Sequence, residues 1–155
     1  MDLDAFTLFE RHINPGLAGL LRFTGLDRVE SHAEGPYVWD TQGKRYLDFL
    51  GLYGTLNLGH RHPKVVEAVK RQLDRMPMSV RVLVSEPTAR LAAKLAEITP
   101  EGLEMVFFGN SGAEAVEAAI KLARAYTGKP GIVTTQGGFH GKTMGALSLT
   151  PKPEY

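Results

Sequence analysis

Residues 105–126 contain a short apolar run, then a cluster of glycines, then a helical pattern. This order limits the folds open to the chain. Residues 105–108 (Met-Val-Phe-Phe) have the composition of a short buried strand, and residues 114–126 predict a helix. A second apolar run at 132–135 predicts another strand. Two short, continuous apolar strands joined by a helix are typical of a βαβ unit. We therefore expect an α/β fold whose sheet is covered by helices.

The glycine-rich junction at 109–113 (Gly-Asn-Ser-Gly-Ala) predicts an anion site. Ligands of α/β folds bind beyond the carboxyl ends of the strands, where a helix presents free N–H groups and the positive end of its dipole. Ser111 adds a hydroxyl donor, and Gly112 lets the backbone approach a phosphate closely. The sequence matches neither the P-loop nor the dinucleotide fingerprint. A plain helix cap at Ser111 explains the same residues, so the pattern leaves both interpretations open.

A second glycine-bounded turn, 137–141, follows the strand predicted at 132–135 and contains Phe139 and His140. Loops that follow neighbouring parallel strands lie side by side at one edge of the sheet. Phe139 could then cover a flat ring whose phosphate lies at Gly112 and Ala113. The alternative is that Phe139 fills the core and His140 caps a turn.

Two other groups of residues have simpler explanations. His60 and His62 could suggest a metal, but such a site needs further ligands, and entry into a helix at Pro63 explains them better. Glu117 and Lys121 have the i,i+4 spacing of an ordinary helix-supporting ion pair. The sequence therefore predicts no metal site.

The N-terminal part predicts a helical arm and a small sheet. A helical stripe over 3–24 is broken at 14–16 (Asn-Pro-Gly), which predicts an arm in two pieces. Aromatic and β-branched runs over 28–50 surround an Asp-x-x-Gly turn and predict an antiparallel meander. The side chains expected to hold this meander together are Trp39, Tyr46 and Phe49.

The segment that follows the meander predicts a loop and then two helices. Residues 51–60 are too rich in glycine for a stable helix and predict an extended loop. Pro63 suits the first turn of a helix that reaches about Arg75. Ser85 and Pro87 mark the start of the next helix.

Composition excludes several classes of protein. The 18 Lys and Arg residues against 17 Asp and Glu give no basic surface for nucleic acid or for an anionic membrane. No apolar stretch is long enough to span a membrane, and the acidic start of the chain does not resemble a signal peptide. The absence of cysteine makes a reducing cytoplasm the simplest location.

Several motifs stand in order along the chain: Tyr37-Val38-Trp39-Asp40, Tyr46-Leu47-Asp48-Phe49, Leu58-Gly59-His60-Arg61-His62-Pro63, the run from Phe108 to Arg124, and Phe139-His140-Gly141. With these motifs the chain resembles class III aminotransferases, which are pyridoxal-phosphate enzymes of the aspartate aminotransferase fold (fold type I) and include acetylornithine, ornithine, 4-aminobutyrate and putrescine aminotransferases. The resemblance implies a helical arm and a β-meander of the small domain over 1–59. It implies the first part of an αβα large domain, with a mixed or mostly parallel sheet, over 60–155.

The resemblance also implies a cofactor site and substrate contacts. Ser111, Gly112 and Ala113 would bind the phosphate of pyridoxal 5′-phosphate, Phe139 would stack on its ring, and His140 would shape that loop. Tyr53 and Lys142 would border the substrate. Acetylornithine and ornithine enzymes resemble one another in having arginine after Phe-His-Gly, where it can grip a carboxylate with two bonds. Lys142 is a single-point charge and is more similar to the putrescine branch.

The implied reaction transfers an amino group from an ω-amino compound or diamine to a 2-oxo acid. No lysine here matches the Schiff-base lysine of the family, so no catalytic residue is assigned. We expect an N-terminal fragment of a homodimeric enzyme that by itself is inactive and binds the cofactor weakly, with 76–84 suited to a partner. The alternative is a non-catalytic phosphate-ligand or interaction module derived from such an enzyme.

Overall fold

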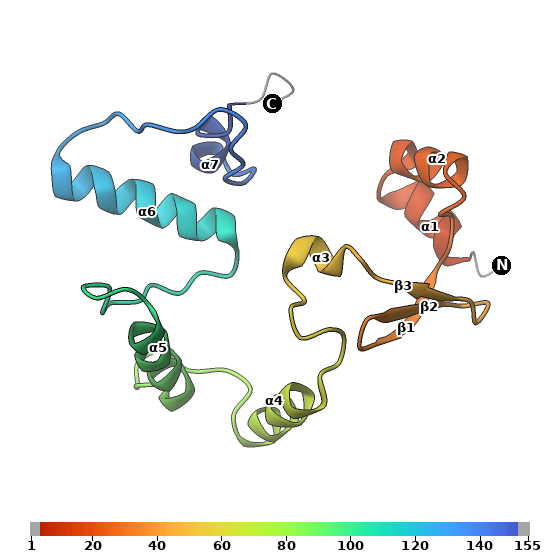
Figure 1. The fold of residues 1–155 in the computed structure, drawn as a ribbon, viewed down its shortest axis with the longest axis horizontal. Coiled ribbons are helices and arrows are strands. Elements are labelled where there is room, and N and C mark those ends of the chain that lie inside the picture. Colours follow the sequence, from red (N-terminus) through yellow and green to blue (C-terminus); the bar gives the residue numbers. More distant parts are fainter. Residues whose placement is uncertain (1–3, 152–155) are drawn as a thin grey trace. The chain divides into compact units, whose positions relative to one another are not determined.

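The computed structural model describes residues 4–151, so Asp2 of the acidic start and Leu3 of the predicted arm lie outside the described residues. The chain divides into two compact units, Met1–Ser79 and Val80–Tyr155. Figure 1 shows the order of the elements along the chain. The predicted domain division at residue 59 stays a prediction.

The first unit begins with the predicted helical arm, formed by α1 (Ala5–His12) and α2 (Pro15–Phe23). Asp4 caps α1 by accepting hydrogen bonds from the N–H groups of Phe6 and Thr7, at 3.0 and 3.1 Å. Asn14 caps α2, where Pro15 occupies the first turn, as the predicted break requires. The two helices pack against each other and bury part of the arm, including Ala18 of α2.

The predicted meander is confirmed as an antiparallel sheet of order β1 (Glu30–Glu34), β2 (Tyr37–Asp40) and β3 (Arg45–Leu47). Trp39 stacks on the ring of His32, with centroids 4.7 Å apart, so it holds the sheet as predicted. Phe49 does not, because it is 92% exposed: the chain leaves the sheet after β3, before it reaches this residue.

Asp40 closes the turn between β2 and β3. Its carboxylate is buried and accepts hydrogen bonds from the N–H groups of Gln42 and Lys44, both at 2.9 Å, and from the hydroxyl of Tyr46 at 2.8 Å. Burial opposes ionisation, but these hydrogen bonds together hold the pKa of Asp40 below its ordinary value. The predicted role of Tyr46 in holding the meander is thus confirmed through a polar contact.

The loop predicted as extended instead begins with a left-handed turn, α3 (Gly51–Gly54). Leu52 and Tyr53 have φ angles of +50° and +55°. Each non-glycine residue in this conformation costs about 1–2 kcal/mol of conformational energy, so the turn needs stabilising contacts from outside it. The prediction from glycine content missed this turn. Pro63 begins α4 (Pro63–Arg75), as predicted.

Asp48 supplies that support from both ends of the loop. Its Oδ1 accepts hydrogen bonds from the N–H groups of Leu50 and Gly51, both at 2.9 Å. Its Oδ2 lies 2.8 Å from Nε2 of His60, and His60 in turn forms a backbone bridge with Gly35 at the sheet. Hydrogen bonds from Gly51 and from His60 lower the pKa of Asp48.

The second unit contains α5 (Glu86–Ile98), α6 (Gly112–Thr127) and α7 (Met144–Ser148). The predicted helices at Ser85 and after Ser111 are confirmed, and α7 was not predicted. Helix α6 ends at Gly128, whose φ of +68° gives the left-handed cap that follows many helices. Helix α7 packs on α6 and fully buries Ala146.

The strands predicted at 105–108 and 132–135 are wrong for this structure, since neither segment forms a strand among the described residues. A strand requires hydrogen bonds to a neighbouring strand, and an apolar sequence alone does not supply them. Val133 is 99% exposed, so its side chain has no sheet or helix covering it.

We predict that Asp48 makes the stability of this chain decrease at acidic pH. Folding lowers the pKa of this carboxylate, so Asp48 stabilises the fold when the pH is above the pKa of the unfolded state, which is about 3.9. This contribution is lost as the pH falls through the lower pKa of the folded state. Thermal unfolding followed between pH 7 and pH 2 should show a lower Tm for Asp48→Asn at neutral pH and converging curves at the acid end. Curves that remain parallel over the whole range would contradict this role.

Candidate functional site

The start of α6 is built by two side chains that cap it. Ser111 Oγ accepts a hydrogen bond from the N–H of Glu114 at 3.2 Å. Glu114 reaches back, and its Oε2 accepts from the N–H of Asn110 at 2.6 Å and from its Nδ2 at 3.0 Å. This arrangement is close to a capping box. Ser111 therefore caps the helix, and its hydroxyl hydrogen remains able to donate to a ligand.

The first turn of α6 has the features of an anion-binding site. The N–H groups of Gly112 and Ala113 are the first two of the helix and have no partner within it. A Cβ at Gly112 would meet nothing within 4 Å, so the space in front of this residue is open. Open space, free donors and the positive end of the helix dipole together fit a phosphate.

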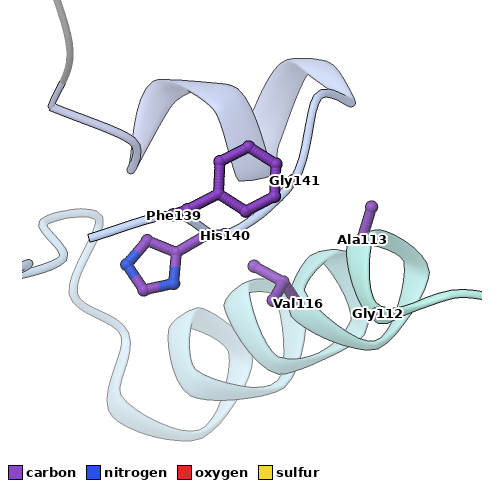
Figure 2. A pocket seen from close by; sticks show the side chains of 6 residues that line it. All are labelled: Gly112, Ala113, Val116, Phe139, His140 and Gly141. Carbon is purple, nitrogen blue, oxygen red and sulfur yellow. The ribbon is translucent and has the colours of Figure 1, made fainter. Parts of the chain in front are cut away.

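A pocket of about 410 Å³ joins this turn to the second predicted motif. The residues that line it are Gly112, Ala113, Val116, Phe139, His140 and Gly141. Figure 2 shows the rings of Phe139 and His140 on one side, and the side chains of Ala113 and Val116 on the α6 side. The two motifs therefore meet as predicted, although the pair of strands expected to bring them together is absent from the described residues.

Close approach at two glycines brings the motifs together. A Cβ at Gly141, whose φ is +126°, would lie 2.7 Å from Cβ of Ala113 and 3.1 Å from Cβ of Ala146. A Cβ at Gly145 would collide with the carboxylate of Glu117. A separation of 2.7 Å is shorter than real Cβ contacts, so the backbone at residue 141 approaches α6 this closely because Gly141 lacks a side chain, whereas a Cβ at residue 145 would displace the carboxylate of Glu117.

His140 is held by a hydrogen-bonded network behind the pocket. Its Nε2 lies 3.0 Å from Oγ1 of Thr134, which donates its only hydrogen to the carbonyl of Leu149 at 2.9 Å. Nε2 must therefore be the donor in this contact. The N–H of His140 donates to Oγ1 of Thr150 at 3.1 Å, and Thr150 donates to the carbonyl of Ala146.

Glu117, predicted only as a helix-supporting residue, makes a contact beside the pocket that the sequence interpretation did not predict. Its Oε1 accepts hydrogen bonds from the N–H groups of Gly145 at 2.8 Å and Ala146 at 3.2 Å. The pKa of Glu117 is lowered mainly by a side-chain hydrogen bond from Thr143. The positive charge of Lys121 lowers it less than any of the hydrogen bonds do. Glu117 follows Ala113 by one helical turn, and this shared face was the available signal.

The two predicted substrate residues lie in different units. Lys142 directly follows Gly141 of the pocket in the second unit. Tyr53 lies on the left-handed turn of the first unit and is 86% exposed. Their roles stay predictions.

No group of three or more metal-ligating side chains occurs within residues 4–151. His62 directly precedes α4, as the helix-entry interpretation predicts, and His60 bonds to Asp48, a contact that the sequence did not predict. In the same described part of the chain, no helix combines the length and the apolar character that crossing a membrane requires.

Comparison with known proteins places the sequence among aminotransferases. The family model described as "Aminotransferase class-III" matches residues 25–155. A putrescine aminotransferase of Pectobacterium atrosepticum is 44% identical over 100% of this chain and 35% of its own length. An acetylornithine aminotransferase of Methanopyrus kandleri is 51% identical over 79% of this chain and 31% of its own length. The chain thus spans about a third of the length of these curated relatives.

Solved structures agree with the sequence comparison. A PMP-bound aminotransferase from Vibrio fluvialis superposes with a TM-score of 0.86 and 30% identity, over 99% of this chain and 36% of the other. An (S)-enantioselective ω-transaminase from Thermomicrobium roseum gives 0.82 and 36% identity, over 99% and 37%. The architecture described above is therefore that of part of a transaminase, and the chain belongs to the class III aminotransferase family.

Proposed function

We propose that this chain forms the part of a pyridoxal-phosphate-dependent aminotransferase that binds the cofactor phosphate and covers one face of its ring. The observation that carries this proposal is the pocket, which combines the free N–H groups of Gly112 and Ala113 with the ring of Phe139. The same pocket is lined by residues of both glycine-rich motifs, which supports a single site formed by the two.

The residues present fit the cofactor. Ser111, Gly112 and Ala113 would donate hydrogen bonds to the phosphate, which the open space over Gly112 admits. Phe139 would stack on the ring, and His140, held by Thr134, would keep the loop in place. When bound, the cofactor supplies the electron sink on which amino transfer depends. No residue of this chain is assigned a catalytic role.

We propose an ω-amino compound or diamine as amino donor and a 2-oxo acid as acceptor. Lys142 follows the pocket residue Gly141, where an arginine would grip a second carboxylate with two bonds. The relatives named putrescine and acetylornithine aminotransferase support this range of donors. Tyr53 is proposed as a further contact with the substrate.

A homodimer and a cytoplasmic location complete the proposal. The segment 76–84 exposes several large apolar side chains, including Met78 at 81% and Val84 at 90%, and such side chains suit a subunit interface. The lack of cysteine in the sequence supports a reducing compartment.

Calorimetry with 4-deoxypyridoxine 5′-phosphate, which lacks the reactive aldehyde, tests the cofactor site on this chain. We predict saturable binding that requires the phosphate, and an affinity about tenfold weaker in Ser111→Ala, because a hydrogen bond to a charged group is lost. Asn14→Ala, which removes the cap of α2, is the matched control and should bind normally. Equal binding of the phosphate-free compound, or normal binding by Ser111→Ala, would contradict the proposal.

Donor preference can be measured after this chain replaces the matching region of the P. atrosepticum putrescine aminotransferase. We predict that Lys142→Arg raises kcat/KM for acetylornithine relative to putrescine by about tenfold, because arginine bonds a carboxylate at two points. Lys129→Arg, two residues beyond the end of α6, is the matched control. An unchanged ratio in Lys142→Arg would remove Lys142 from the substrate site. Loss of all activity in the unmodified chimera would favour the non-catalytic module.

A further inference from the structure

We propose that Glu117 is a positioning residue that sets the place of the Phe139–His140 loop relative to the phosphate-binding turn of α6. This inference rests on the proposed cofactor site. Glu117 would set the distance between the N–H groups that bind the phosphate and the ring of Phe139 that covers the cofactor. Glu117 itself does not line the pocket.

Glu117 caps α7 from a neighbouring helix. Thr143 is the N-cap residue of α7, but its side chain makes no capping hydrogen bond to that helix. Oε1 of Glu117 instead accepts the N–H groups of Gly145 and Ala146 in the first turn. Two of the orphan donors at the start of α7 are thus satisfied by a side chain of α6, which ties the start of α7 to α6.

Short contacts connect α7 to the residues that line the pocket. The carbonyl of Ala146 accepts a hydrogen bond from Thr150 at 3.1 Å, and Thr150 accepts one from the N–H of His140 at 3.1 Å. Ala146 is fully buried, and Gly141 of the pocket approaches both Ala146 and Ala113. A shift of α7 would therefore move His140 and its neighbour Phe139.

The fit around Glu117 shows that the segment accommodates this carboxylate specifically. A Cβ at residue 145 would displace the carboxylate of Glu117 from its present position, so the contact as observed needs glycine there. The alternative role, an i,i+4 pair with Lys121 that supports α6, predicts no contact with α7. These two roles predict different behaviour when Lys121 is changed.

The test compares Glu117→Ala, Glu117→Gln and Lys121→Ala by amide hydrogen exchange and by binding. Glu117→Ala should raise exchange at His140 and Ala146 by about tenfold and leave exchange at Ile120, in the buried face of α6, unchanged. Glu117→Gln, which keeps the Oε1 acceptor, should stay near wild type, as should Lys121→Ala. Unchanged exchange at His140 in Glu117→Ala, a rise that includes Ile120, or an equal effect of Lys121→Ala would overturn the inference.

Binding gives a second readout that helix stability alone does not move. Glu117→Ala should weaken 4-deoxypyridoxine 5′-phosphate about tenfold while leaving the affinity for inorganic phosphate unchanged, because only the ring depends on Phe139. An equal loss for both compounds would overturn the positioning role. If the wild-type chain binds neither compound, the proposed cofactor site fails, and hydrogen exchange at His140 alone then decides whether Glu117 positions the loop.

Discussion

The pocket depends on the close approach of the backbone around Gly141 and Gly145 to the first two turns of α6. Hydrogen bonds from two amides of α7 to Glu117 hold this contact; a Cβ at Gly141 would collide with Cβ of Ala113, and a Cβ at Gly145 would displace the carboxylate of Glu117. Because the contact fixes where the chain lies on both sides, it places Phe139 opposite the free N–H groups of Gly112 and Ala113. The meeting of the two motifs in one pocket follows from this packing.

Features that depend on neighbouring residues were predictable from the sequence. Pro63 and Ser111 start helices because their chemistry satisfies or removes the donors of a first turn, and these signals are local. The hairpin around Asp40 is likewise set by residues within one turn. The meeting of Ser111-Gly112-Ala113 with Phe139-His140 was predicted from the adjacency of parallel strands, and the structure achieves it through glycine-mediated packing on α6 instead.

Features that depend on distant partners were not predictable in the same way. The apolar runs at 105–108 and 132–135 have the composition of strands, but strand formation requires a hydrogen-bonding neighbour that composition does not encode. The left-handed turn at Leu52 and Tyr53 is maintained by Asp48 and His60 acting from outside it. Glu117 has the spacing of a helix pair with Lys121, and only the fold reveals its contact with α7.

The central claim is that one pocket holds both the phosphate and the ring of the cofactor. Amide NMR of this chain during titration with 4-deoxypyridoxine 5′-phosphate tests it directly. The signals of Gly112 and Ala113 should shift together with those of Phe139 and His140 and follow one binding curve, and the phosphate-free compound should leave Gly112 and Ala113 unmoved. Shifts confined to other helix N-termini, or separate curves for the two motifs, would contradict a shared cofactor site.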